Sequence, residues 1–151
     1  MSNPSRILTR EQAAARSAVL RSAGCGIVFT NGCFDILHPG HVHVLSRAAA
    51  LGDVLFVGVN TDDSVRRLKG TGRPVQNLEA RASVLASIRY VDYVVPFSED
   101  TPLELVAALR PHIIVKGGDY SRDEVAGGEL ADSVVIVPLL HGHSTTGLIR
   151  R

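Results

Sequence analysis

The sequence predicts an α/β sandwich in which a five-stranded parallel sheet carries helices on both faces. Three observations support this fold class. Helical and strand-like segments alternate along the chain, one inner strand is apolar almost without interruption, and no repeat or linker divides the 151 residues. Because this length suits one domain, we expect a single domain over residues 1–151, with an N-terminal helix within 1–24 and a core over 26–151.

The first predicted elements are a helix, a strand and a second helix. Residues 9–23 are expected to be helical, because Thr9 and Gln12 can form a capping box and glycines follow the segment. Residues 26–31 are the first expected strand. The second helix is expected over 41–51, where a glycine stops it.

The remaining elements continue this alternation. Residues 54–60 are almost all apolar, which indicates a strand covered on both faces, and residues 78–89 carry apolar side chains at helical spacing. The later elements are expected in the order strand, helix, strand, strand and helix, at residues 93–97, 102–109, 113–116, 134–139 and 145–151. Strands joined by helices form right-handed parallel crossovers, so the expected architecture is a Rossmann-like sandwich.

Composition and charge restrict the possible partners. Sixteen Lys and Arg residues against 15 Asp and Glu give a net charge of +1, which argues against nucleic acid or an anionic membrane as a partner. The apolar stretches are far shorter than the roughly 18 residues of a membrane-span candidate. Residues 1–6 lack the apolar segment of a signal peptide, so we expect a cytoplasmic protein. Cys25 and Cys33 form no CxxC pair and are expected to be reduced, small buried residues.

Ligands of open parallel sheets bind beyond the carboxyl ends of the strands. Four segments are expected at that edge, namely residues 31–41, 60–74, 116–120 and 141–146. Most of the unusual residues of the chain lie in these segments, so we expect the functional site there.

The segment after the first strand contains the sequence His38-Pro39-Gly40-His41. Proline favours the first helical position, so His38 is expected to cap a helix whose first N–H groups attract an anion. His38 and His41 lie three residues apart, on one side of the first turn, where both rings can donate hydrogen bonds to one phosphate. Gly40 lets a ligand approach closely. This arrangement is suited to charge that develops on a phosphoryl group during transfer.

Two other interpretations of these histidines are open. They can be incidental surface or core residues, or they can bind zinc together with the nearby His43 and Cys33. The i, i+3 spacing differs from the i, i+4 spacing of the HExxH zinc motif, so no dedicated metal site is expected. A non-enzymatic nucleotide- or metal-binding module is a further alternative, but no GxGxxG follows the first strand.

Residues 31–35, Asn-Gly-Cys-Phe-Asp, followed by the His-Pro-Gly-His sequence, resemble the HxGH signature of the nucleotidyltransferase superfamily that includes the cytidylyltransferases. Residues 144–146, Ser-Thr-Thr, resemble its second signature, a Ser/Thr-rich turn that opens the last helix. Within this superfamily the chain is most similar to the heptose 1-phosphate adenylyltransferases. The segments that carry this similarity are 60–62, 67–70, 73–75, 79–81, 90–92 and 115–120.

The resemblance implies that ATP and a heptose 1-phosphate yield ADP-heptose and pyrophosphate, in a stand-alone enzyme that forms a homodimer. The main alternative is a cytidylyltransferase that uses CTP and glycerol 3-phosphate or a related alcohol phosphate. Those enzymes carry an arginine after the last strand, in a pattern similar to RTEGIST, and residues 138–145 contain none. The heptose interpretation is therefore favoured.

The resemblance also assigns roles to individual residues. A sugar phosphate is already anionic, so alignment and charge matter more than a general base. His38, His41 and Lys69 are the expected catalytic residues, with Lys69 as a mobile charge in a glycine-flanked loop. Magnesium is expected on the triphosphate of ATP. The expected nucleotide-binding residues are Thr30, Asn31, Gly32, Phe34, Gly40, His41, Asn60, Lys116, Gly117, Gly118, Asp119, Ser144, Thr145 and Thr146.

Substrate binding is expected at Asp35, Lys69, Arg73 and Arg81. For Asp35 the alternative is a turn residue that holds its loop. For Arg81 the alternatives are a contact with a dimer partner and an exposed salt bridge. Its partner in that salt bridge would be Glu79 or Asp92. Simpler alternatives also exist for Lys69, for residues 117–119 and for residues 144–146: a surface lysine, a tight turn and an ordinary helix N-cap, respectively.

Overall fold

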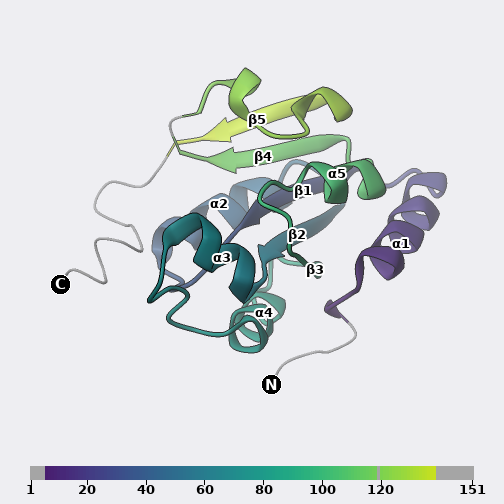
Figure 1. Ribbon diagram of the computed structural model, residues 1–151. Helices are drawn as coiled ribbons and strands as arrows, with labels where there is room; N and C mark the ends of the chain where they lie inside the picture. Colours follow the sequence, from purple (N-terminus) through teal and green to yellow (C-terminus); the bar gives the residue numbers. More distant parts are fainter. Residues whose placement is uncertain (1–5, 119, 139–151) are drawn as a thin grey trace.

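The computed structural model describes residues 6–118 and 120–138, and in this part of the chain five parallel strands form one sheet. The strand order is β3-β2-β1-β4-β5. The strands are β1 (Ile27–Gly32), β2 (Val54–Asn60), β3 (Tyr93–Phe97), β4 (Ile113–Gly117) and β5 (Ser133–Val137). The chain therefore builds outward from β1 in one direction, returns, and builds outward in the other direction (Figure 1). The predicted fold class is confirmed, and the order reverses between β1 and β4.

At this reversal point the sheet register leaves the carboxyl ends of β1 and β4 unpaired. β1 pairs with β2 along its whole length, from Ile27↔Val54 to Gly32↔Val59. Its ladder with β4 covers only Val28↔Ile113 and Phe29↔Ile114, so it stops three residues before the end of β1. The carboxyl ends of β1 and β4 are thus not paired with each other, and open α/β sheets bind ligands at such a point.

Two apolar clusters cover the two faces of the sheet. On one face, α2 (Pro39–Ala49) and α4 (Leu78–Ala86) bury side chains such as Leu45 and Leu85. On the other face, α1 (Arg10–Ser22) and α5 (Leu103–Leu109) bury side chains that include Ala13 and Leu105. Helices on both faces explain why the inner strand β2 is apolar almost throughout.

Local signals fix the helix starts closely. The Thr9–Gln12 capping box opens α1 as predicted. His38 is the N-cap of α2 with proline at the first helical position, so this helix begins two residues before the expected 41. The helix expected over 78–89 ends at Ala86, because a tighter turn follows it.

One helix differs from the sequence expectation. Residues 60–74 were expected at the carboxyl edge of the sheet with no helix assigned to them, but they contain α3 (Asp62–Lys69). Thr61 caps its N-terminus, acidic residues occupy its first turn and basic residues its last turn, which suits the helix dipole. Only Ser64 and Val65 of this helix are buried, so the apolar spacing that reveals most helices is missing.

The rest of the described chain adds short turns and no membrane span. Two 3₁₀ turns, η2 (Arg122–Glu124) and η3 (Gly128–Leu130), connect β4 to β5. The last strand ends at Val137, earlier than expected, and the helix expected over 145–151 lies outside the described residues. Within 6–118 and 120–138, every helix is too short or too polar to cross a bilayer.

Candidate active site

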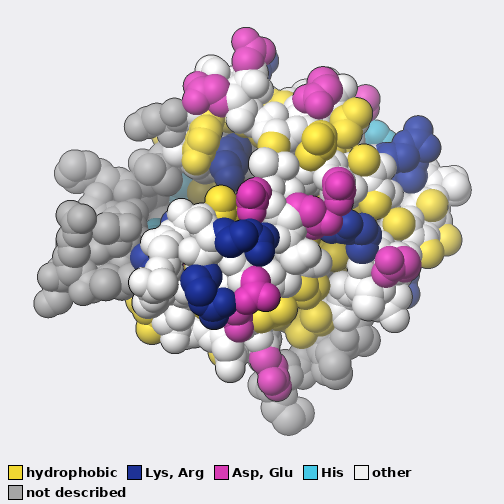
Figure 2. Space-filling view, viewed as in Figure 1, with side chains coloured by type: hydrophobic (Ala, Val, Ile, Leu, Met, Phe, Trp, Pro, Cys, Tyr) yellow, Lys and Arg dark blue, Asp and Glu magenta, His cyan; other side chains and the backbone are white. Residues whose placement is uncertain are grey.

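A cavity of about 300 Å³ opens at the carboxyl ends of β1, β2 and β4. Figure 2 shows a hollow between the α3 side of the molecule and the β4–β5 edge, with Lys or Arg side chains recessed in it. The lining residues are 31–33, 60, 68–69, 100–102, 116, 120 and 124–126. The cavity therefore lies at the reversal point of the strand order and brings together seven separate stretches of the sequence.

His38 and His41 stack at the start of α2, beside this cavity. Their ring centroids are 3.8 Å apart. The Nδ1 of His38 accepts a hydrogen bond from the Gly40 amide at 3.1 Å, and the Nδ1 of His41 accepts one from the His38 amide at 3.3 Å. A ring nitrogen that accepts a hydrogen bond carries no proton, so each neutral ring carries its hydrogen on Nε2. Both imidazoles can then act as Nε2–H donors, as the spacing predicts.

The electrostatics of the site keep His41 neutral. Burial, followed by the charges of His38 and Lys69, lowers the pKa of His41 to about 4. The influence of Lys69 also connects the histidines to the cavity, because Lys69 lines the cavity and the histidines do not. A neutral His41 donor beside a lysine can bind a phosphate oxygen without adding a buried charge of its own.

Phe34 supports the His41 ring from behind. Its ring centroid lies 5.4 Å from that of His41, and its backbone φ of 49° is unusual for a side chain of this size. Gly32 permits this arrangement, because a Cβ at Gly32 would lie 3.1 Å from the Phe34 ring. Phe34 and Gly32 therefore shape the site through packing, in addition to the nucleotide-binding role expected of them.

The chain contains only two lysines, Lys69 and Lys116, among its 16 basic residues, and both line the cavity. Lys69 is the last residue of α3 and not part of a glycine-flanked loop as expected, although Gly70 follows it directly. Burial lowers the pKa of Lys116, whose Nζ lies 5.2 Å from the Tyr120 ring centroid. Among the described residues no carboxylate lies within ion-pair distance of either ammonium. Such uncompensated cations in a cavity attract an anion.

Cys33 lies near both lysines and is not the small buried residue that was expected. Both cysteines are free and partly exposed, and Cys33 lines the cavity. Its thiol lies 3.7 Å from the Oδ1 of Asn60, and burial raises its pKa. A raised pKa means that the thiol is protonated at neutral pH, so it adds a neutral polar group to the cavity wall.

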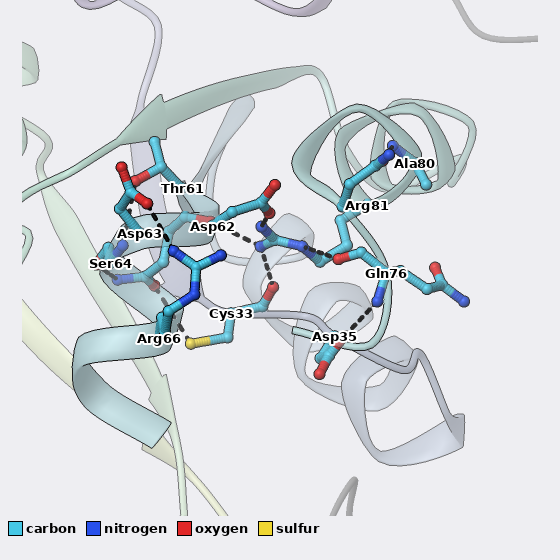
Figure 3. Close-up of polar contacts among 12 residues, drawn as sticks. Cys33, Asp35, Thr61, Asp62, Asp63, Ser64, Arg66, Gln76, Ala80 and Arg81 are labelled. Atoms are coloured by element: carbon cyan, nitrogen blue, oxygen red, sulfur yellow. Dashed lines mark hydrogen bonds and ion pairs between the residues drawn. The ribbon is translucent and has the colours of Figure 1, made fainter. Parts of the chain in front are cut away.

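Arg81 is buried at the centre of the loops that frame the cavity (Figure 3). Its guanidinium donates to the carbonyl oxygens of Cys33, Asn60 and Gln76 and, at 2.6 Å, to the carboxylate of Asp62. The alternative interpretation of Arg81, an exposed salt bridge with Glu79 or Asp92, is therefore wrong. Its partners instead make Arg81 a positioning residue, because it holds the ends of β1 and β2 against α3 and α4.

Asp35 holds the loop before α4. Its side chain is 1% exposed and accepts hydrogen bonds from the Nε of Arg73 at 2.6 Å and from the amides of Val75 and Gln76. Burial by itself raises the pKa of Asp35, but the hydrogen bonds from Gln76, Val75 and Arg73 outweigh it and lower the pKa. Of the two sequence interpretations, these contacts favour the residue that holds its loop, and they engage Arg73 in the same task.

The other expected binding residues at the strand ends also have internal partners. Thr30 is buried within β1, and the Nδ2 of Asn60 donates to the Ser64 hydroxyl at 2.9 Å. Gly117 has no room for a side chain, because a Cβ would lie 2.7 Å from Val44. Gly118 has a φ of 120° and donates its amide to the Val137 carbonyl at 3.0 Å. Asp119, Ser144, Thr145 and Thr146 lie outside the described residues.

The sequence analysis missed the wall formed by the segment before α5. Asp100 and Thr101 line the cavity, and Arg67 of α3 bonds to Asp100 at 3.0 Å and to the Ser98 carbonyl. Glu124 also lines the cavity. The cap and dipole pattern of residues 61–69 was a usable signal for α3, but no local signal marks residues 100 and 124 as neighbours of one cavity.

The described residues give no support to the zinc interpretation. Across 6–118 and 120–138, no three His, Cys, Asp or Glu side chains come together as a group that could hold a metal ion. The two histidine rings use their Nδ1 atoms within the α2 cap.

Comparison with known proteins gives a consistent result. Residues 29–141 match the model of the cytidylyltransferase-like family. The chain is 54% identical over 142 residues to the bifunctional protein HldE of Bradyrhizobium sp. (strain ORS 278), which covers 91% of this chain and 29% of that protein. The corresponding match in Aliarcobacter butzleri (strain RM4018) is 50% identical over 147 residues, and covers 97% and 31%. The chain thus spans about three tenths of the length of these relatives.

Two solved structures resemble the fold. The lipopolysaccharide core biosynthesis protein from Thermoplasma volcanium GSS1 has a TM-score of 0.64 and 30% identity, over 78% of this chain and 98% of that one. Pantoate-beta-alanine ligase from Francisella tularensis, complexed with β,γ-ATP and β-alanine, has a TM-score of 0.66 at 17% identity, over 87% and 66% of the two chains. The second likeness concerns the fold alone.

Proposed function

The chain belongs to the cytidylyltransferase-like family, and we propose that it transfers AMP from ATP to a heptose 1-phosphate, giving ADP-heptose and pyrophosphate. The similarity to the bifunctional HldE proteins and to the lipopolysaccharide core biosynthesis protein supports this choice of reaction. The residues of the site support the reaction type. ATP is chosen over CTP because the arginine typical of the alcohol-phosphate cytidylyltransferases is missing from residues 138–145.

The observation that carries the proposal is the histidine pair at the start of α2. Two imidazoles with Nε2–H groups lie at the positive end of a helix, next to a cavity that contains both lysines of the chain. Preorganised donors of this kind stabilise charge that grows on oxygen during phosphoryl-type transfer. His38 and His41 would bind the α-phosphate and the oxygen that bridges it to the β-phosphate.

The reaction needs placement more than proton transfer. A phosphate oxygen of the sugar phosphate attacks the α-phosphorus of ATP in line, a new oxygen–phosphorus bond forms, and the bond to the β-phosphate breaks. The electron pair leaves on pyrophosphate. The nucleophile is an anion near neutral pH, so no strong base is required. Lys69 neutralises negative charge on the bound phosphates of ATP and the sugar phosphate.

The remaining expected residues divide between the two ligands. Asn31, Lys116 and residues 117–119 lie on the path of the nucleotide in this proposal, and residues 144–146 complete the binding of its terminal phosphates. Asp35, Arg73 and Arg81 act on the substrate side by holding the loops between β1 and α4 in place.

Magnesium fits this site as a companion of ATP. The described residues of the strand ends present amides and lysines to the cavity and no carboxylate cluster, so phosphate oxygens and water would be its main ligands. Bound there, Mg²⁺ neutralises charge on the triphosphate. His38, His41 and Lys69 would orient the phosphates around it.

The test is a nucleotide screen with pyrophosphate release as the readout. We expect turnover with ATP and heptose 1-phosphate, and little with CTP, GTP or UTP or with glycerol 3-phosphate. His38→Ala should lower kcat by at least about 100-fold, because one lost donor of this kind costs that much. Turnover with CTP and glycerol 3-phosphate would favour the cytidylyltransferase alternative, and full activity of His38→Ala would refute the histidine assignment.

The setting of the enzyme is part of the same proposal. ATP and sugar phosphates are metabolites of the cytoplasm, where we place the reaction, and we propose a homodimer. Light scattering of the purified chain measures its mass directly, and a mass of 16.1 kDa at working concentration would exclude the dimer.

A further inference from the structure

The segment between β3 and α5 is held by arginines from two helices. Its residues 100–102 line the cavity, and Glu99 directly precedes them. From α3, Arg67 bonds to the Asp100 carboxylate, and from α1, Arg10 bonds to the Glu99 carboxylate. The described lining residues include none from α1. The position of this part of the cavity wall therefore depends on a helix that does not itself reach the cavity.

The contact between Arg10 and Glu99 is bidentate. Nη2 of Arg10 donates to Oε1 at 2.6 Å and Nη1 donates to Oε2 at 2.9 Å, and each side chain is 30% exposed. The hydrogen bond from Arg10 is the main cause that lowers the pKa of Glu99 to about 2, so this carboxyl is charged at neutral pH. Glu104 is a second carboxylate near Arg10, at 3.6 Å. Two parallel bonds fix the orientation of a carboxylate more firmly than one.

The backbone of Glu99 continues this contact into the molecule. Its carbonyl oxygen accepts a hydrogen bond from the Ser64 hydroxyl at 3.1 Å, and this hydroxyl accepts one from the Nδ2 of Asn60 at 2.9 Å. The Oδ1 of Asn60 lies 3.7 Å from the Cys33 thiol, and Asn60 and Cys33 both line the cavity. Ser64 and Asn60 are buried. A displacement of Glu99 must therefore shift or break these bonds.

We propose that Arg10 and Glu99 are positioning residues, which hold residues 100–102 and the Ser64–Asn60 hydrogen bond in the geometry that catalysis needs. The inference rests on the proposed function and deepens it, because it extends the working parts of the active site to α1. This helix packs beside α5 on one face of the sheet (Figure 1), and that packing fixes where Arg10 lies. Arg10 and Glu99 act through the wall and not on the ligands, since neither lines the cavity.

The test is a double-variant cycle of Arg10→Gln, Glu99→Gln and both changes together, with Arg10→Lys as the conservative variant. The matched control is Arg16→Gln, because Arg16 lies on the same helix but bonds to the Tyr93 hydroxyl at 2.7 Å, at the start of β3. Glu104→Gln is a second control, because it removes the other carboxylate beside Arg10 and leaves Glu99 unchanged.

Two readouts are compared with the melting temperature. Pyrophosphate release with ATP and heptose 1-phosphate gives kcat and KM, measured well below the melting temperature. Alkylation by iodoacetamide, a neutral reagent, reports on Cys33 without nucleotide or sugar phosphate. Peptide mass spectrometry separates Cys33 from Cys25, which is also free. A merely structural ion pair would lower the melting temperature and change neither readout.

We expect Arg10→Gln and Glu99→Gln each to lower kcat/KM about tenfold, because a small displacement of a positioned wall is enough for such a loss. The double variant should lose about as much as either single variant, since both changes remove the same contact. Cys33 should react at least about threefold faster in all three, because its partner Asn60 moves. The melting temperature should fall by no more than about 4 °C. Arg10→Lys should recover part of kcat/KM, and both controls should match wild type.

The proposed reaction and the positioning role fail separately in this design. No turnover in wild type would remove the reaction, and the alkylation rates of Cys33 would then decide the positioning role. Unchanged alkylation in Arg10→Gln, or an unchanged kcat/KM where wild type is active, would overturn the role. Losses that multiply in the double variant, or equal losses in Arg16→Gln, would overturn it as well.

Discussion

Arg81 and Asp62 form an ion pair of 2.6 Å in which the arginine side chain is completely buried and the aspartate side chain is 38% exposed. The pair joins α4 to the start of α3, and the same guanidinium bonds the ends of β1 and β2. The Arg81 guanidinium therefore holds the ends of two strands and the start of α3 together at the carboxyl edge of the sheet. A buried cation of this kind is costly unless every partner is present, so its neighbours should be sensitive to change.

Replacing Arg81 tests this role. We expect Arg81→Met to lower the free energy of unfolding by about 3 kcal/mol, because the carbonyls of Cys33 and Asn60 and the carboxylate of Asp62 lose their donor. Urea denaturation measures the change. The control Arg66→Met breaks an exposed pair with Asp63 and should cost no more than about 0.5 kcal/mol. Equal costs for the two variants would show that the buried network contributes nothing specific.

Asp35 should make the fold sensitive to acid. Its pKa is lowered in the folded state, so its stabilising contribution is complete above the pKa of the unfolded chain and is lost as the pH falls through the folded value. We expect Asp35→Asn to cost about 2 kcal/mol at pH 7 and to flatten the decline of stability between pH 5 and pH 3. Urea midpoints across this range provide the measurement. An unchanged decline in the variant would mean that another carboxyl causes it.

His41 should titrate far below an ordinary histidine. Its pKa is lowered to about 4 by burial and by the charges of His38 and Lys69, so the folded state resists protonation. The unfolded chain takes up the proton near pH 6.5, and stability therefore decreases as the pH falls from about 6.5 toward 4. Nitrogen-detected NMR of the imidazoles should show a neutral Nε2–H form of His41 at pH 6. A midpoint near 6.5 for this ring would contradict the neutral-donor role.

Lys116 should contribute to activity at the expense of stability. Burial lowers its pKa, so the charged form is disfavoured in the folded state, and this cost persists at every pH below the folded value. We expect Lys116→Met to keep or raise the melting temperature at pH 7 while kcat/KM falls by about 100-fold. Calorimetric melting and pyrophosphate release measure the two effects. The exposed Arg47→Gln is the matched loss of one charge and should change neither. A destabilised Lys116→Met with normal kinetics would make this lysine structural.

Local patterns predicted much of the fold. The capping box at Thr9, the proline after His38 and the apolar run of residues 54–60 each act over a few neighbouring residues, and the structure contains the helix starts and the strand that they indicate. The helix α3 was missed because it buries only two residues, so its evidence lay in its caps and charges. Helix ends were less certain than helix starts, as at Ala86, since a final turn tightens without a clear signal.

The sequence by itself determined the sheet, its crossovers and the histidine cap, because these depend on periodicity and on contacts within one turn. Only the tertiary structure decided which side chains line the cavity and which hold its surrounding loops in place. Arg81 lies 48 residues from Cys33, and Asp35 lies 38 residues from Arg73. Contacts over such separations form when strands and helices pack, and residue type alone does not distinguish an arginine that binds a ligand from one that satisfies buried carbonyls.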